Sequence, residues 1–184
     1  MMYKTHLASS IAAGAGIAQI LSIPFTIGFL GGLSLGSLLP DIDEPNSYIG
    51  RRSFGLSYLV KKKYGHRGMT HSLLAFCFFL YLVVFFPTYF NLGLCLGYLF
   101  HIIGDFFSKT GVPLFYPFDI SRKKSPITYK TSSFAETVIL FISILTATVL
   151  ILNEKMLSPL FYSTGELISN ILLALLKVTS LINN

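Results

Sequence analysis

The sequence predicts an all-α protein, a polytopic membrane helical bundle of about six transmembrane or membrane-embedded helices. Composition is the first reason, because the 184-residue chain is 53% hydrophobic and only 12% charged, whereas soluble domains carry about 25% charged residues. The second reason is that the apolar residues gather in six segments, each near the roughly 17–25 residues of a membrane span. These segments cover residues 7–23, 25–39, 72–90, 92–108, 134–152 and 165–182.

The first two segments are expected to form a tight helical hairpin. Segment 7–23 could pass for a signal peptide, but further apolar segments follow it, and we therefore interpret it as the first membrane helix. Segment 25–39 is short for a complete span. Its glycines recur at four-residue spacing, which lets helix backbones approach closely. They are Gly28, Gly32 and Gly36.

The other four segments complete the predicted bundle. Segments 72–90 and 92–108 form a second hairpin through a short uncharged turn, whereas segments 134–152 and 165–182 carry no motif. The two cysteines of the chain lie inside apolar segments. We therefore expect neither a disulfide framework nor a cysteine-based zinc site.

Basic residues predict how the bundle is oriented. They concentrate in the loops 40–71 and 109–133, which two crossings separate, so both loops lie on one side of the membrane. The positive-inside rule makes that side cytoplasmic and predicts that both termini are cytoplasmic. The net charge of +6 thus reflects topology and anionic lipid, and we expect no nucleic-acid partner. We expect one domain over 1–184, with a motif-bearing four-helix core at 1–118 and a basic loop with two C-terminal helices at 119–184.

Seven candidate metal ligands fall at the predicted cytoplasmic ends of the first four helices. They are His6, Asp41, Asp43, His66, His71, His101 and Asp105. His101 and Asp105 are four residues apart on one helix, so their side chains share a face. Such a pair in an apolar helix indicates a functional site, although it could also be a hydrogen-bonded pair that locks helices together. With the other five residues at the same depth it predicts a metal site, and imidazole with carboxylate suits zinc, manganese or iron.

Two loop motifs supply most of these candidates. In LPDIDEP, Asp41 and Asp43 are expected to point to different sides, so that one faces a metal while the other caps a backbone or orients a ligand. The alternative is an exposed acidic turn. In GHRGMTHSLL, we expect Thr70 to cap the third helix and His71 to begin it. His66 lies in the preceding loop, as a ligand, a proton-transfer group or a residue that orients a ligand.

Four blocks of the sequence, spread over about residues 3–118, also point to a known family. They read THLASSIAA, LPDIDEPNS, GHRGMTHSLL and LGYLFHIIGDFFSKTGVPLFYPF. These blocks resemble the signature motifs of the YdjM-type inner-membrane metal-dependent hydrolases, a family also described as LexA-binding. The histidine and aspartate pattern of that family is similar to that of zinc-dependent phospholipase C and P1 nuclease, which are all-helical enzymes that cleave phosphoester bonds.

The resemblance implies a location in the bacterial inner membrane and a set of metal ligands. The implied ligands are His6, Asp41, His71, His101 and Asp105, with His66 as a further candidate. No histidine follows residue 101, so a complete three-zinc site is not expected. We expect one or two divalent ions, with Zn²⁺ as the first choice and Mn²⁺ or Fe²⁺ as alternatives.

The predicted function is that of a phosphoesterase acting on a phospholipid or lipid-linked phosphate at the cytoplasmic face. Asp43 or His66 would transfer a proton, and Arg67 would attract the phosphate. Two other functions stay open. An ion or proton transporter would place polar residues at both membrane faces, and a non-catalytic scaffold would fill the metal coordination with protein ligands.

Overall fold

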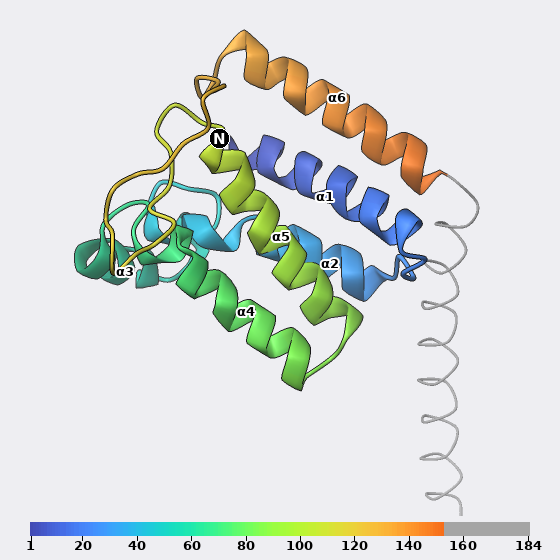
Figure 1. Cartoon of the computed structure of the whole chain (residues 1–184), viewed down its shortest axis with the longest axis horizontal. Helices are drawn as coiled ribbons and strands as arrows, with labels where there is room; N and C mark the ends of the chain where they lie inside the picture. Colours follow the sequence, from blue (N-terminus) through green and yellow to red (C-terminus); the bar gives the residue numbers. More distant parts are fainter. Residues whose placement is uncertain (153–184) are drawn as a thin grey trace, which may run out of the picture.

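Five helices run side by side in the computed structural model, which describes residues 1–152 (Figure 1). They are α1 (Tyr3–Ile20), α2 (Ile27–Gly36), α4 (Leu73–Phe85), α5 (Tyr89–Phe106) and α6 (Phe134–Ile151). At one end of this bundle lie the short helix α3 (Leu56–Tyr64) and the 3₁₀ turns η1 (Leu39–Asp43), η2 (Gly50–Arg52) and η3 (Met69–His71). No residue in the described range belongs to a β-strand, which confirms the predicted all-α class for that range.

Five of the six predicted apolar segments correspond to helices, and segment 165–182 lies outside the described residues. Helix α2 is shorter than expected, because the chain passes into η1 soon after Gly36. Helix α3 was not predicted. It carries lysines and lies between Gly55 and Gly65, both with positive φ, so a search for long apolar segments does not find it.

Helix α6 is, among the described helices, the one that is long and apolar enough to cross a membrane by length and composition. Its outer face is apolar, with Phe141, Leu145 and Val149 each more than 60% exposed. Contiguous apolar surface of this kind marks a protein or membrane contact. Helices α2 and α4 have 10 and 13 residues and are therefore only about 15 and 20 Å long.

Helix starts follow from side-chain caps. The hydroxyls of Thr26, Ser72, Thr88 and Ser133 accept a hydrogen bond from a backbone N–H in the first turn of α2, α4, α5 and α6, respectively. The prediction that Thr70 caps α4 was wrong. The cap is Ser72, because the Thr70 hydroxyl donates to a carboxylate of η1 and the chain forms η3 before α4 begins.

The bundle is centred on α2 and α5, which pack against each other more extensively than any other described pair. Four glycines make this possible: Gly32, Gly36, Gly93 and Gly97. The contacts are reciprocal. A Cβ at Gly32 would collide with the backbone of Phe90, and a Cβ at Gly93 would collide with the backbone of Phe29. This close approach holds the end of α5 against the chain that leaves α2.

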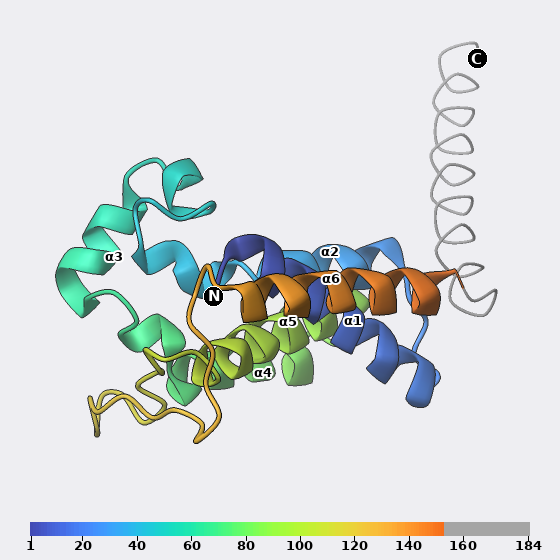
Figure 2. The same ribbon diagram turned by 90° about the horizontal axis from the view of Figure 1, so that it is seen from above.

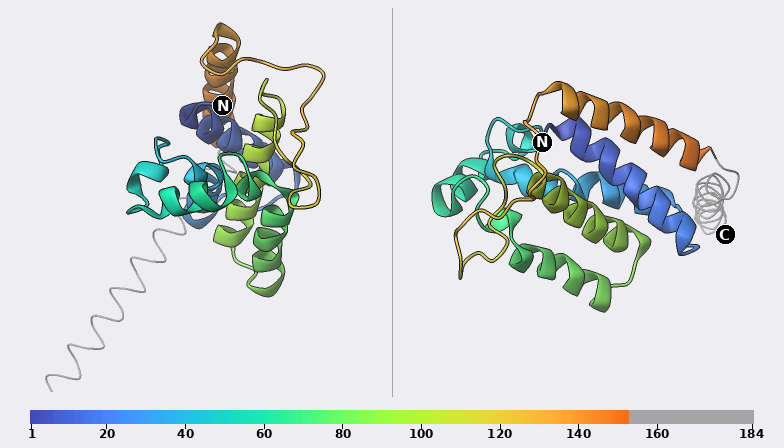
Figure 3. Two further views of the ribbon diagram at one scale, coloured as in Figure 1. Left: turned by 90° about the vertical axis from the view of Figure 1, so that its left-hand side faces the viewer. Right: turned by 45° about the horizontal axis from the view of Figure 1, so that its top comes forward.

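The long loops lie at one end of the bundle. Residues 37–72 and 107–133 leave the helices there, and α3 and the later loop extend to opposite sides of the bundle axis (Figure 2). Seen end-on, these segments surround the start of α1 (Figure 3). The two basic loops thus lie at the same end, as predicted, and the side of the membrane that this end faces stays a prediction.

Candidate metal centre

The structure brings the five predicted ligands together at the loop end of the bundle. They come from α1 (His6), η1 (Asp41), η3 (His71) and the last turns of α5 (His101 and Asp105). Four of them are fully buried, and the side chain of Asp41 is 17% exposed. Their donor atoms form two groups, each within 4.8 Å, that could hold a metal ion: His6 with Asp41 and His101, and His71 with His101 and Asp105.

Hydrogen bonds fix the tautomers of two of the imidazoles. The Nδ1 atom of His101 lies 2.7 Å from the carbonyl oxygen of Ser37, which can only accept, so the proton is on Nδ1. The Nδ1 atom of His71 lies 3.1 Å from the Thr70 hydroxyl, whose own proton goes to Asp43, and 3.2 Å from the Asp43 carboxylate, so His71 also carries a proton on Nδ1. Nε2 is therefore the atom of each ring that can bind a metal, and the two Nε2 atoms lie 3.2 Å apart.

Two lone pairs at this distance repel each other unless a proton or a metal ion lies between them. The separation of 3.2 Å is close to the edge of about 3.3 Å of a tetrahedron built from Zn–N bonds of about 2.0–2.1 Å. The geometry of His71 and His101 thus fits two ligands of one tetrahedral ion.

Two carboxylates approach the same point. The Asp41 Oδ1 atom lies 3.8 Å from the Nε2 atom of His71 and 3.7 Å from that of His101. The Asp105 Oδ2 atom lies 3.5 and 3.8 Å from the same two nitrogens. Two nitrogens and two oxygens therefore converge, and this donor set suits zinc, manganese or iron.

His6 lies next to this group. Its ring stacks on that of His101, with the centroids 3.6 Å apart, and its Nε2 atom is 3.4 Å from the Asp105 Oδ1 atom. Within residues 1–152, neither ring nitrogen of His6 has a hydrogen-bond partner, although the ring is buried. A buried polar group without a partner needs an explanation. An ion held by His6 together with Asp41 and His101 would give this buried ring a partner.

Asp43 is the centre of the hydrogen bonds that shape the GHRGMTH loop. It accepts from the Nδ1 atom of His66 (2.9 Å), the backbone N–H of Arg67 (2.8 Å) and the hydroxyl of Thr70 (2.5 Å), in addition to His71. Burial raises the pKa of Asp43, but these hydrogen bonds outweigh burial and hold the pKa well below its usual value. Asp43 is therefore ionised, and it orients His71 rather than facing the converging donors.

The carboxylates around His71 favour a positive charge there. Burial of the ring would lower the pKa of His71, but Asp105 and Asp43 outweigh burial and raise the pKa to about 9. Either a proton or a metal ion can supply this positive charge, and a bound metal would displace the proton.

Arg67 faces the cluster from the same loop. Its guanidinium is 2.8 Å from the Asp105 Oδ2 atom and also donates to the hydroxyls of Ser108 and Thr110. The side chain is 9% exposed. In this geometry the guanidinium holds Asp105 in place, and its predicted contact with phosphate stays a prediction.

A polar pocket of about 350 Å³ opens beside Asp41. His66 lines it with a side chain that is 38% exposed, and Arg51 and Arg67 contribute positive charge. The donor atoms of Asp41 can therefore be reached from the loop end of the molecule.

The sequence reasoning missed two groups that position the centre. Glu136 of α6 is fully buried, and its carboxylate accepts from the backbone N–H groups of Met2 (2.5 Å) and Ser132 (2.6 Å). It thereby ties the start of α1, which carries His6, to α6. The spacing of Ser133 and Glu136 is that of a capping box, which could have identified it. The second group is the Ser37 carbonyl, a backbone group that no pattern of residue types in the sequence could have indicated.

Comparison with known proteins gives consistent matches. The model of the YdjM inner membrane protein family matches residues 1–179. The chain is 46% identical over 90 residues to the inner membrane protein YdjM of Escherichia coli (strain K12). The aligned region covers 45% of this chain and 46% of that protein. The Shigella flexneri protein of the same name matches equally. The uncharacterized protein YvsG of Bacillus subtilis (strain 168) is 34% identical over 145 residues, 76% of this chain and 88% of that protein.

This chain covers about half the length of the YdjM proteins that it matches, 46% in each case. No solved structure matches the chain. The comparisons do not show the likeness to phospholipase C and P1 nuclease, which stays a prediction. They do support the predicted inner-membrane location, because the family and the E. coli and Shigella relatives are named inner membrane proteins. The match over residues 1–179 shows that the chain belongs to the YdjM inner membrane protein family.

Proposed function

We propose that this protein is a multi-pass inner-membrane hydrolase with one or two divalent metal ions, most simply Zn²⁺. Its substrate would be the phosphoester of a phospholipid or of a lipid-linked phosphate at the cytoplasmic face. The observation that carries the proposal is the approach of the His71 and His101 Nε2 atoms to 3.2 Å, with the Nδ1 atom of each ring turned to an outer partner. The Asp41 and Asp105 carboxylates complete a donor set that fits a metal ion.

Each residue of the site would have a defined task. His71, His101 and Asp105 would hold the first ion, with Asp41 close to the same two nitrogens, and His6 would hold a second together with Asp41 and His101. When bound, such an ion lowers the pKa of a water and polarises a phosphoryl oxygen. His66 reaches the polar pocket while its Nδ1 atom contacts Asp43, so it can transfer a proton to or from a bound substrate.

Charge in the polar pocket supports an anionic substrate. Arg51 and Arg67 line the pocket together with the carboxylates of Asp41 and Glu44. Guanidinium groups favour phosphate through charge-assisted hydrogen bonds. We expect Arg51 to be the more available of the two, because it is exposed whereas Arg67 is buried against Asp105.

Access to Asp41 favours catalysis over a purely structural metal. A structural site is closed by protein ligands, whereas a catalytic site keeps a position for water or substrate. The transporter alternative is less well supported. Residues 7–40 and 73–100 contain no Asp, Glu, Lys, Arg or His, so the far end of the described bundle offers no titratable relay.

Metal analysis combined with hydrolysis assays tests the proposal. Purified protein is expected to hold one or two equivalents of metal and to hydrolyse p-nitrophenyl ethyl phosphate or phosphatidylglycerol. His101→Ala and Asp105→Asn should lose both properties. Asp119→Asn is the matched control, because Asp119 is an exposed loop carboxylate paired with Lys123 and lies outside the cluster. Bound metal without hydrolysis would favour a scaffold, and protein that binds no metal would refute the proposal.

A further inference from the structure

An apolar groove runs beside the metal centre, between α1, α5 and α6. It encloses about 510 Å³, within the range of small-molecule sites. Its walls are almost entirely hydrocarbon. Ser9 and Ala13 of α1, Phe100 and Ile103 of α5, and Ala135 and Ile139 of α6 are among the residues that line it.

Gly104 lines the groove and lies against the His6 ring, one of the candidate ligands. A Cβ at this position would lie 3.0 Å from the Met1 Sδ atom and 3.4 Å from the His6 ring. The absence of a side chain thus lets the His6 ring lie directly behind Gly104, which lines the groove. Tyr129 closes this end, because its hydroxyl donates to the Gly104 carbonyl at 2.8 Å.

The polar pocket lies on the other side of the same centre. It is lined by Asp41, His66 and Arg67, whereas the apolar groove is lined by Gly104 and its neighbours. Met1 lines both spaces, and its amino group is 2.8 Å from the Asp105 Oδ1 atom. The apolar groove and the polar pocket are therefore neighbours that meet at Met1, beside the cluster.

We propose that the groove binds the hydrocarbon chain of a lipid phosphoester, with the phosphate at the metal centre and the polar head group in the polar pocket. This inference rests on the proposed function and specifies its substrate as an amphiphile. The adjacency of an apolar groove and a polar pocket with two arginines, which meet at Met1 beside the metal donors, matches the adjacency of hydrocarbon chain and charged head group in such a molecule.

The outer rim of the groove fits entry from the side. Ile103 and Phe107 are both 42% exposed and Ile127 is 82% exposed, so the rim is apolar as well as open. Exposed apolar surface of this kind marks a contact with lipid or protein. A chain would pass from the surrounding bilayer into the groove without crossing water, and burial of each CH₂ contributes about 0.8 kcal/mol relative to water.

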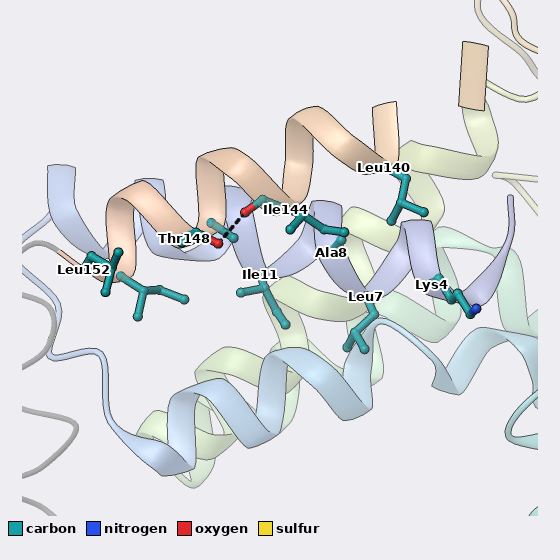
Figure 4. A pocket seen from close by; sticks show the side chains of 10 residues that line it. Lys4, Leu7, Ala8, Ile11, Leu140, Ile144, Thr148 and Leu152 are labelled. Atoms are coloured by element: carbon teal, nitrogen blue, oxygen red, sulfur yellow. Dashed lines mark hydrogen bonds between the residues drawn. The ribbon is translucent and has the colours of Figure 1, made fainter. Parts of the chain in front are cut away.

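A second groove provides a matched control. It encloses about 540 Å³ between α1 and α6, and Figure 4 shows its lining residues. Leu7, Ala8 and Ile11 of α1 line it together with Leu140 and Ile144 of α6. It has similar size and chemistry. Unlike the first groove, it is not lined by Met1 or Gly104, which contact candidate ligands, although Leu7, the chain neighbour of His6, lines it.

The two grooves allow one substitution to be compared on the same helix. Ala13→Phe fills the groove at the metal centre, and Ala8→Phe fills the control groove. Ala135→Phe enters the first groove from α6, so the test does not depend on one variant alone. Binding of hexadecyl phosphate, geranylgeranyl phosphate and ethyl phosphate to the metal-loaded protein in detergent is measured by thermal shift. The straight and the prenyl chain distinguish a phospholipid from a prenyl-linked source.

We expect Ala13→Phe and Ala135→Phe to weaken binding of a long-chain phosphate about tenfold relative to ethyl phosphate, as filling an apolar subsite does. Ala8→Phe should leave this ratio unchanged. The inference would be overturned if the affinity for long-chain phosphate relative to ethyl phosphate were the same in all variants, or if Ala8→Phe lowered it as much as Ala13→Phe. Chain-dependent binding without hydrolysis of p-nitrophenyl hexadecyl phosphate would keep the groove and reject the phosphoesterase. If instead wild type and Ala13→Phe each hydrolysed p-nitrophenyl ethyl phosphate and p-nitrophenyl hexadecyl phosphate at the same rate, the phosphoesterase would stand and the groove would be rejected as the site of the chain.

Discussion

The Nε2 atoms of His71 and His101 lie 3.2 Å apart, although 30 positions separate the two residues in the sequence. Each ring is held at its Nδ1 atom, on the side away from the centre. The Ser37 carbonyl fixes His101, and the Asp43 carboxylate fixes His71. The outer partners therefore turn the Nε2 atom of each ring towards the centre, where a cation, either a proton or a metal ion, can lie between the two nitrogens.

Removal of a bound metal should destabilise the protein. A ligand present at about a thousand times its dissociation constant stabilises the folded state by about 4 kcal/mol. We therefore expect a strong chelator to lower the melting temperature and added Zn²⁺ to restore it, as followed by thermal denaturation in detergent. His101→Ala should abolish the response and Asp119→Asn should keep it. A chelator response that survives in His101→Ala would place the metal elsewhere.

Asp43→Asn should weaken metal binding without abolishing it. The substitution removes the negative charge that accepts from His66, Arg67, Thr70 and His71 while keeping the shape of the side chain. Loss of a carboxylate that orients a ligand typically costs about 10–100-fold in metal affinity. Zinc affinity measured by competition with a chromogenic chelator checks this. Asp41→Asn, which alters a donor directly, should cost more, and the opposite order would exchange the roles of the two aspartates.

The sequence was sufficient for the local parts of the site. The spacing of His101 and Asp105 requires a shared helix face, and both are buried at the end of α5. The expectation that the two aspartates of LPDIDEP differ also agrees with the geometry. Asp41 approaches the imidazoles, and Asp43 accepts hydrogen bonds from the loop.

Tertiary and backbone contributions could not be predicted in the same way. The ion pair of Arg67 with Asp105 depends on a loop whose backbone has a positive φ at a non-glycine residue. Helix α3 depends on glycines at its ends rather than on an apolar run, and the Ser37 carbonyl depends on where α2 stops. Patterns of residue type carry no direct information on such contacts.

Glu136→Gln should reduce both stability and metal binding, although Glu136 is no candidate ligand. Both carboxylate oxygens accept from backbone N–H groups, and an amide would turn an N–H₂ towards one of these donors. A buried donor left without a partner costs about 1–3 kcal/mol. The loosened start of α1 should also misplace His6.

Glu44→Gln is the control for Glu136→Gln, because Glu44 forms a partly exposed ion pair with Lys61. Such pairs contribute about 0–1 kcal/mol. Unfolding by heat or denaturant, together with metal content, compares the two variants. Equal effects would show that Glu136 does not tie α1 to α6 in the way described.

The packing of α2 against α5 leads to the last prediction, that Gly36→Ala disrupts the centre although Gly36 contacts no candidate ligand. A Cβ at Gly36 would overlap the Leu94 carbonyl and must push α5 away from α2. Overpacking of this kind costs about 1–3 kcal/mol. The displacement acts where the chain leaves α2, so it also moves Ser37 relative to His101 and should lower metal affinity.

Gly31→Ala provides the matched control on the same helix, since a Cβ at Gly31 would meet no atom within 4 Å among the described residues. Alanine exceeds glycine in helix propensity by about 1 kcal/mol, and this variant should be neutral or stabilising with unchanged metal content. Melting temperature and bound metal are measured for both. If Gly36→Ala melted like Gly31→Ala and kept its metal, the α2–α5 contact would not be what positions His101, and the origin of the 3.2 Å approach would lie in the loops instead.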